Sequence, residues 1–397
     1  MTVPKLRFKE FDGGWTKSTI QFFMDNNFIL DQMDGNHGEL YPKSEEFSAT
    51  GVPYISATDF SFGDVNFATC KRLPIERAKL FKKGIAKNGD VLFAHNATVG
   101  PVAILKTDLD FVILSTTATY YRCEATYLNN HYLKNYFESD FFVQQYFGIM
   151  SQSTRNQVPI TTQRKLNIAV PNIQEQTKIA SFLSAVDEKI SQLTQKHELL
   201  SQYKQGMMQK LFSQQLRFKA DDGSEFREWE EKELKDIAEI NPKSKKLPES
   251  FIYIDLESVE KGQLLLQKNI ELQDAPSRAQ RLLAKGDVLF QMVRPYQQNN
   301  YYFNLSGEYV ASTGYAQIRT KLDSKFIYYA LHEKTFLDEV MNRCTGTSYP
   351  AINSSDLSSI EILIPCLEEQ TKIANFLSAI DQKIEVVAQQ IEQAKTW

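Results

Sequence analysis

Residues 171–190 read PNIQEQTKIASFLSAVDEKI, and residues 365–384 read PCLEEQTKIANFLSAIDQKI. The second stretch begins 194 residues after the first, and 14 of the 20 positions are identical. Self-similarity over such a stretch is the signature of a duplicated structural unit. With 397 residues, the chain is also long enough for two domains of ordinary size. We therefore expect a tandem duplication in which each domain is followed by a copy of the same helix.

Two shorter segments repeat as well. GDVLF occurs at residues 89–93 and again at 286–290, and LRFK occurs at 6–9 and again at 216–219. The offsets are 197 and 210 residues, so the halves differ by insertions and deletions between these landmarks. The helix segments match closely whereas the domains diverge. This contrast indicates that the two helices share one role and that the two domains have different ones.

The segment from residue 174 to residue 212 has the composition of one long helix, with no proline and one glycine. At 1.5 Å per residue it would be about 58 Å long, more than a domain of this size needs. Apolar residues recur every seven positions in both copies, which predicts an antiparallel coiled coil between them. The alternative is that each apolar stripe packs into the core of its own domain. The seam residues are Ile179, Val186, Ile190, Leu193, Leu200, Met207, Ile373, Ile380, Ile384 and Val387.

Both domains combine short strands with short helices, so the expected fold class is α+β. Strands are expected at 52–55, 91–93, 111–114, 252–254, 288–290 and 360–364, and helices around 128–148 and 324–341. The two domains would lie in a pseudo-twofold arrangement, separated by the two long antiparallel helices. The expected boundaries are 1–172 for the first domain, 173–213 for the central helix, 214–366 for the second domain and 367–397 for the C-terminal helix.

Composition and charge set limits on function. The net charge of −4 gives no overall steering toward nucleic acid, so any DNA binding must come from local surfaces. The four cysteines show neither CxxC spacing nor a nearby histidine, so we expect no metal site and no disulfide framework. No apolar run approaches the roughly 18 residues of a membrane span. We expect a cytoplasmic protein with no membrane partner.

A run of basic residues is the first candidate DNA-binding feature. Seven Lys and Arg residues between positions 71 and 87 are accompanied by a single acidic residue, Glu76. A solvated charged face without a ligand is the alternative. The candidates chosen from this run are Lys71, Arg72, Lys79, Lys82 and Lys83.

Three polar loops are the other candidates. Residues 294–301 read RPYQQNNY, where Arg suits guanine and Asn or Gln suits adenine, although a polar loop with no such role is the alternative. The loops at 153–157 and 345–349 occupy equivalent places before the two long helices and offer hydroxyl and amide groups. The candidates are Arg294, Tyr296, Gln297, Gln298, Asn299, Arg155, Asn156, Gln157, Thr347, Ser348 and Tyr349.

Motifs of catalysis are absent from the sequence. There is no GxxxxGK[ST] phosphate loop, no GxGxxG, no (D/N)PP(Y/F) and no HExxH. The five histidines are widely spaced, which argues against an acid–base or metal site. We therefore expect no catalytic residue in this chain.

The duplicated GDVLF, followed in each half by a proline and EQTKIAxFLSAxDxKI, resembles the specificity subunit of type I restriction-modification enzymes. Residues 173–190 and 367–384 resemble the repeated helix starts of that family, and YKQGMMQKLF at 203–212 resembles the end of its central helix. The resemblance implies two target-recognition domains that each read one half of a split, asymmetric DNA sequence, with the paired helices setting the gap between the halves.

The resemblance also implies the partners. They would be double-stranded DNA, two methyltransferase subunits that bring S-adenosylmethionine for adenine methylation, and restriction subunits that act as motor-nucleases with ATP and magnesium. The chain itself would bind no cofactor. A coiled-coil scaffold without DNA readout is the competing hypothesis. One departure is that the 194-residue offset places Tyr203 on Trp397, so we expect a C-terminal helix shorter than the central one.

Overall fold

The computed structural model describes residues 6–36, 38–61, 63–150, 156–243 and 246–396. The chain divides into two compact units, unit 1 (Met1–Lys189) and unit 2 (Ile190–Trp397). The boundary between the units falls within the central helix and not at its start. None of the helices in the described ranges is both long enough and apolar enough to cross a membrane.

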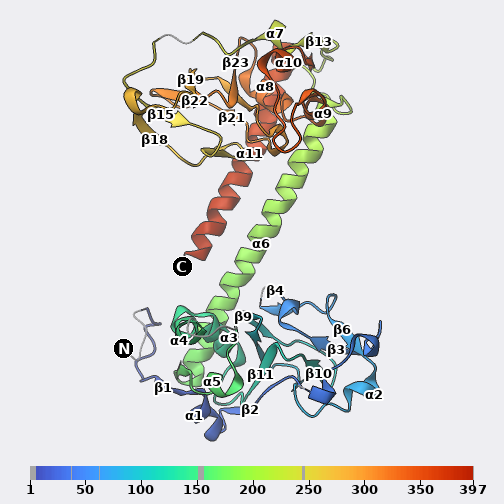
Figure 1. Cartoon of the computed structure of the whole chain (residues 1–397), viewed down its shortest axis with the longest axis vertical. Helices are drawn as coiled ribbons and strands as arrows, with labels where there is room; N and C mark the ends of the chain where they lie inside the picture. Colours follow the sequence, from blue (N-terminus) through green and yellow to red (C-terminus); the bar gives the residue numbers. More distant parts are fainter. Residues whose placement is uncertain (1–5, 37, 62, 151–155, 244–245, 397) are drawn as a thin grey trace. The chain divides into compact units, whose positions relative to one another are not determined.

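Unit 1 contains short strands and helices ahead of the central helix (Figure 1). Its strands are β1 (Thr16–Thr19), β2 (Ile29–Asp34), β3 (Val52–Ile55), β4 (Phe60–Ser61), β5 (Asp64–Val65), β6 (Lys71–Leu73), β7 (Ile85–Ala86), β8 (Val91–Asn96), β9 (Thr98–Ile104), β10 (Val112–Leu114), β11 (Ala118–Cys123) and β12 (Asn167–Val170). Its helices are α1 (Ile20–Asp25), α2 (Ile75–Ala78), α3 (Asn130–Glu138), α4 (Asp140–Met150), α5 (Ile160–Gln163) and the first part of α6 (Ile173–Phe212).

The sheets of unit 1 are layered. One sheet has the strand order β2-β11-β8-β9 and the other β6-β3-β10-β7, and only β3 and β10 pair in parallel. Alternate residues of β8 face opposite sides, as a strand requires. Val91 and Phe93 pack with α3 and α4, whereas Leu92 packs with residues of the second sheet. The first sheet therefore lies between the helices and the second sheet.

Unit 2 repeats these elements. Its strands are β13 (Glu230–Glu233), β14 (Ala238–Ile240), β15 (Ser250–Ile254), β16 (Val259–Glu260), β17 (Gln263–Leu264), β18 (Lys268–Glu271), β19 (Ala279–Leu282), β20 (Val288–Gln291), β21 (Tyr301–Tyr302), β22 (Tyr309–Ser312), β23 (Tyr315–Thr320) and β24 (Glu361–Ile364). Its helices are the last part of α6, α7 (Leu234–Ile237), α8 (Ser324–Ala330), α9 (Lys334–Arg343), α10 (Ser354–Ser358), α11 (Leu367–Lys395) and a 3-10 turn, η5 (Pro295–Gln297).

The two units share one topology. The sheets β14-β23-β20-β21 and β18-β15-β22-β19 have the same connectivity as those of unit 1, and β15 with β22 is again the parallel pair. The expected α+β class, the duplication and the expected strands are confirmed. Each expected short-helix segment consists of two helices, because Ser139 ends α3 in an extended conformation and residues 331–333 separate α8 from α9.

The long helices pack together within unit 2. Lys204 Nζ of α6 lies 2.6 Å from Asp381 Oδ1 of α11, and Leu211 shares a core with Ile373 and Leu377. Figure 1 shows α11 running opposite to this part of α6, so the two helices are antiparallel.

None of the predicted seam residues is exposed. Leu193 and Val387 are 6% and 3% exposed. Ile373 and Ile380 also belong to the globular core of unit 2, and Ile179 packs on the core of unit 1. The start of each long helix therefore also packs on its own domain, which is the alternative to a coiled coil given for these apolar stripes.

Candidate nucleic-acid interface

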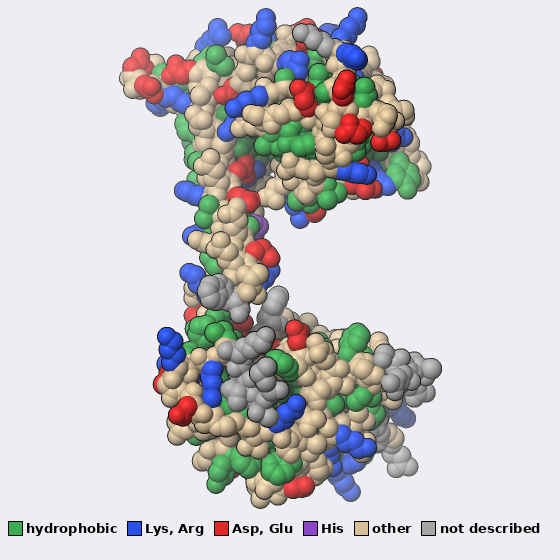
Figure 2. Space-filling model, turned by 90° about the vertical axis from the view of Figure 1, so that its left-hand side faces the viewer, with side chains coloured by type: hydrophobic (Ala, Val, Ile, Leu, Met, Phe, Trp, Pro, Cys, Tyr) green, Lys and Arg blue, Asp and Glu red, His purple; other side chains and the backbone are tan. Residues whose placement is uncertain are grey.

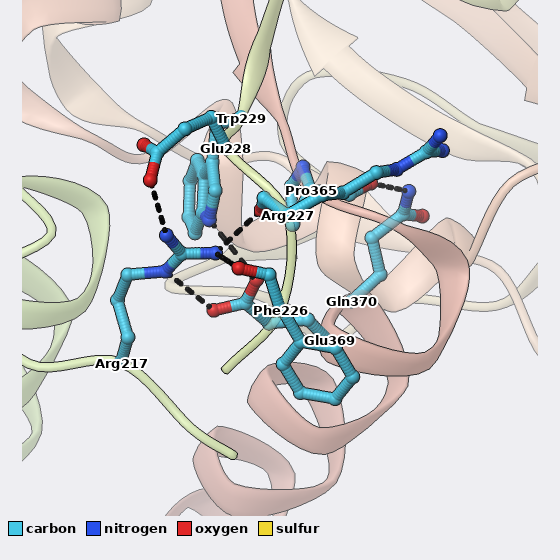
Figure 3. Close-up of polar contacts among 8 residues, drawn as sticks. All are labelled: Arg217, Phe226, Arg227, Glu228, Trp229, Pro365, Glu369 and Gln370. Carbon is cyan, nitrogen blue, oxygen red and sulfur yellow. Dashed lines mark hydrogen bonds and ion pairs between the residues drawn. The ribbon is translucent and has the colours of Figure 1, made fainter. Parts of the chain in front are cut away.

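The most strongly repeated residues anchor each long helix to its own domain. At the start of α11, the carboxylate of Glu369 accepts two hydrogen bonds from Arg217, with Nε–Oε1 at 3.2 Å and Nη2–Oε2 at 3.0 Å. The indole Nε1 of Trp229 donates to the same carboxylate at 3.2 Å. Figure 3 shows the three side chains converging at the first turn of the helix. The carboxylate is fully buried, so these donors replace its water.

Unit 1 contains the same arrangement. Arg7 donates to Glu175 through Nε and Nη2, both at 2.6 Å, and Trp15 Nε1 lies 3.3 Å from the same carboxylate. The hydrogen bonds to Glu175 raise the pKa of Arg7. The repeated LRFK and EQ segments therefore join the chain that precedes each domain to the helix that follows it.

The glutamine next to each of these glutamates is buried too. Gln370 donates to the carbonyl group of the proline that begins the repeat and accepts from the backbone N of Asp323 at 3.2 Å. Gln176 makes the equivalent bonds, with Asn129 in place of Asp323. Asp323 and Asn129 are the N-cap residues of α8 and α3. The glutamines therefore fix the short helices against the long ones.

The aspartate of GDVLF binds an arginine on the neighbouring strand. Asp287, 1% exposed, accepts from Arg319 Nε at 2.7 Å and Nη2 at 2.8 Å. Asp90, 2% exposed, accepts from Arg122 at 3.0 and 2.8 Å. Burial raises the pKa of Asp90, and the hydrogen bonds from Arg122 oppose that shift. Both repeated motifs thus have structural roles.

Two of the candidate loops of unit 2 lie against each other. Residues 293–299 follow β20, and residues 345–351 form a hairpin closed by backbone hydrogen bonds. The backbone N of Arg294 donates to the carbonyl of Pro350 at 2.7 Å and joins the two loops. We call residues 293–299 and 345–351 the unit 2 corner.

The unit 2 corner carries an arginine in contact with an aromatic ring. Cζ of Arg294 lies 4.3 Å from the ring centroid of Tyr349, within the range of a cation–π contact. Tyr349 and Tyr296 are 63% and 50% exposed. Three further candidates are exposed in the corner: Gln297, Thr347 and Ser348.

Side-chain amide groups form hydrogen bonds that hold the unit 2 corner. Gln291, 2% exposed, donates to Gln297 Oε1 at 2.9 Å and accepts from the backbone N of Asn299 at 3.1 Å. Oδ1 of Asn299 accepts from the backbone N of Lys261 at 3.0 Å, and Gln298 donates to a backbone carbonyl between α8 and α9. The structure thus places the Gln298 and Asn299 side chains in contacts within the protein.

The corresponding place in unit 1 pairs the β8–β9 turn with the loop before α5. The backbone N of Ala97 donates to the carbonyl of Asn156 at 3.0 Å, and Asn96 forms a bridge with Gln157. We call residues 95–98 and 156–158 the unit 1 corner. Asn156 is exposed and Gln157 is half-buried. Arg155, also a candidate, lies outside the described residues.

The two corners have one backbone framework and unlike side chains. Ala97 and Arg294 hold the same position, with φ of +65° and +55°, in the left-handed region that non-glycine residues seldom adopt. Asn96 bridges Gln157 where Val293 bridges Ala351. Unit 2 therefore presents an arginine where unit 1 presents a methyl group.

The basic run of unit 1 lies in other elements, on β6, beside α2 and before β7. Arg72 donates to two backbone carbonyl groups, Lys71 stacks over a phenylalanine ring and Lys79 pairs with a neighbouring glutamate. Lys82 and Lys83 are exposed and, in the described part of the chain, form no ion pair. The run therefore supplies fewer available cations than its sequence indicated.

Figure 2 shows basic and acidic side chains interspersed on the face of unit 2 that is drawn.

Two residues that contact the unit 2 corner, Lys261 and Gln291, were not among the predicted site residues. Lys261 has φ +49° in the β16–β17 turn, and its ammonium-bearing side chain is 87% exposed. Gly262, which follows Lys261, indicates a turn in the sequence. The sequence does not indicate that this turn lies next to the loop of residues 293–299. Gln291 ends β20 and has no signal in a single sequence that separates it from an ordinary strand residue.

The family of the type I restriction modification DNA specificity domain matches this chain twice, at residues 31–202 and 227–396. The matches together span most of the chain, so the chain belongs to this family. It is a DNA specificity subunit of a type I restriction-modification system.

Individual relatives agree with the family. The putative type I restriction enzyme MjaX specificity subunit of Methanocaldococcus jannaschii is 29% identical over 329 residues, which are 77% of this chain and 76% of the relative. The MjaVIII specificity subunit of the same organism is 28% identical over 252 residues, 58% of this chain and 59% of the relative. The fold is similar to the crystal structure of the type I restriction-modification S subunit from M. genitalium, with TM-score 0.60, 16% identity, and coverage of 99% of this chain and 96% of that one.

Proposed function

We propose that this subunit reads a bipartite, asymmetric DNA sequence, one half-site with each unit, through the two corners. The observation that carries this proposal is the pair of equivalent backbone hydrogen bonds, Ala97 N to Asn156 O and Arg294 N to Pro350 O, which hold unlike side chains. Base identity is read by side-chain groups at base edges, whereas the framework only positions them. One framework with two sets of side chains suits two different half-sites.

The subunit works within a complex. We propose two methyltransferase subunits that bring S-adenosylmethionine, and restriction subunits that use ATP and magnesium. In this complex, the chain supplies recognition and no catalysis, and the paired helices α6 and α11 fix the number of base pairs between the half-sites. Membership of the specificity-subunit family supports this assignment.

The test is to produce the chain with its methyltransferase partner and to sequence the methylated bases of the host cell. The expected result is a bipartite motif with a methylated adenine in each half. The purified complex should shift a duplex that carries this motif, in a salt-sensitive manner, in preference to a scrambled duplex. Binding that is blind to sequence would contradict the proposal and favour a coiled-coil scaffold.

A domain exchange tests the assignment of half-sites. Residues 213–366, which lie between the end of α6 and the start of α11, are replaced by the matching segment of another specificity subunit. We expect one half of the methylated motif to change and the other half, with the spacing, to persist. A change in both halves would refute the modular arrangement.

A further inference from the structure

We propose that Arg294 is the guanine-reading residue of unit 2. The proposal rests on the proposed function and adds to it the base and the atoms that one residue contacts. The guanidinium group would donate two parallel hydrogen bonds to O6 and N7 of a guanine in the major groove, which is the pair of acceptors that a guanine presents on one edge.

The first argument is the state of the guanidinium group in the free chain. Its Cζ lies over the ring of Tyr349, 4.3 Å from the ring centroid. Among the residues that the structure describes, Arg294 forms no ion pair and its side chain donates no hydrogen bond. The N–H donors of the guanidinium group are therefore available to an acceptor outside the described chain.

The second argument is the backbone. Arg294 has φ +55°, a conformation that costs energy for a residue with a side chain and that concentrates at functional sites. It is held by the hydrogen bond to Pro350 at 2.7 Å and by the backbone N of Gln297, which donates to the carbonyl of Arg294 at 3.0 Å. The buried Gln291 amide holds the same loop, because its Nε2 donates to the Val293 carbonyl and to Gln297 Oε1. The arginine thus projects from a loop whose geometry is set before DNA binds.

The third argument comes from the other unit. Ala97 occupies the equivalent position with φ +65° and the equivalent hydrogen bond. The fold of this corner therefore does not require an arginine side chain. The same comparison indicates that Arg294→Ala is compatible with the backbone, which makes it a usable variant.

A phosphate contact is the competing role for Arg294, which is half-buried. A guanidinium group also matches the geometry of a phosphate with two parallel hydrogen bonds, so the shape of the group fits both roles. The exposed side chains of the corner are uncharged and can hydrogen-bond base edges, so the corner offers no cluster of cations to the phosphate backbone: Tyr296, Gln297, Thr347, Ser348 and Tyr349.

The experiment uses the complex of the full chain with its methyltransferase partner and a duplex that carries the methylated motif. Each guanine of the half-site that changes on exchange of residues 213–366 is replaced, one at a time, by 7-deazaguanine, which lacks the N7 acceptor. With the wild-type complex we expect one position at which affinity falls about tenfold. With Arg294→Ala we expect a similar loss on the normal duplex and no further loss from 7-deazaguanine at that position.

Arg227→Ala is the matched control, because it removes an exposed arginine of unit 2 outside the corner. It should leave both the affinity and the 7-deazaguanine profile unchanged. A phosphate role for Arg294 predicts an equal loss on the motif and on a scrambled duplex, and that result would overturn the proposal. A half-site without a G·C pair would also overturn the proposal, and so would a wild-type complex whose affinity no 7-deazaguanine changes. Neither of these two results depends on how the variant folds. If the wild-type complex prefers no sequence at all, the proposed function itself fails.

Discussion

Arg217 and Glu369 lie 152 residues apart in the chain, yet their side chains form a two-point ion pair at the start of α11. The Glu369 side chain is fully buried and the Arg217 side chain is 16% exposed. Arg7 and Glu175 repeat this pair at the start of α6. Each long helix is thus bound at its first turn to the segment that precedes its own domain, which explains why LRFK and EQTKIA are repeated together.

Glu369→Gln should destabilise unit 2 by roughly 3 kcal/mol, because it removes the buried counter-charge of the mostly buried Arg217 side chain. Urea denaturation measures the change as a lower transition midpoint. Glu228→Gln is the control, since Glu228 pairs with the same arginine at 3.5 Å but is 90% exposed. Equal midpoints for the two variants would show that the buried pair does not stabilise the unit.

Asp287→Asn should lower the free energy of unfolding by about 2 kcal/mol, because hydrogen bonds to a charged acceptor become weaker and an amide donor meets the donors of Arg319. The Arg319 side chain is 40% exposed, so solvent screening reduces the Coulomb part. The thermal midpoint measures the effect. Glu239→Gln removes an exposed charge near the same arginine and should leave that midpoint unchanged.

Leu193→Asp should reduce both helicity and stability, by about 3 kcal/mol or more, because it places a charge at a position that is 6% exposed. Circular dichroism and urea denaturation measure the two effects. Leu199→Asp is a matched control in the same part of α6, where the leucine is 58% exposed. If both aspartates were tolerated equally, the seam would not stabilise the helix pair.

His332 should make stability depend on pH. Its Nδ1 lies 2.7 Å from the Tyr328 carbonyl, and its Nε2 lies 3.4 Å from Asn300 Nδ2, an arrangement that suits the neutral ring. Burial lowers its pKa, the hydrogen bond with the Tyr328 carbonyl opposes that shift, and the charge of Lys204 lowers the pKa further. Below about pH 6.5 the unfolded chain therefore binds a proton that the folded chain does not, so stability falls as pH falls, by at most about 1.4 kcal/mol per pH unit.

Urea denaturation at pH 7.5 and pH 5.5 tests this pH dependence. His332→Gln should lose less stability than the wild type between the two values, because the amide does not titrate in this range. An identical loss in both proteins would mean that other groups cause the pH dependence.

The candidate site was only partly predictable. The residue types of the Arg294 loop and of Tyr349 were visible in the sequence, because Arg, Gln and Tyr in a turn-rich stretch indicate base contacts. Their contact was not, since the two residues are 55 positions apart in the chain and meet only because Arg294 bonds to Pro350. In the basic run, the sequence did not show that Arg72 and Lys79 form contacts within the protein.

The sequence by itself determined the duplication, the long helices, the α+β class and the family, because these rest on repeated letters and on local periodicity. Only the tertiary structure decided what the repeated letters do. Asp90 and Glu175 bind arginines brought to them by strand pairing and by chain reversal. Whether a polar side chain faces the protein or the solvent depends on contacts between distant segments. For that reason the repeated motifs belong to the scaffold, and the two corners that differ are the candidate DNA-reading surfaces.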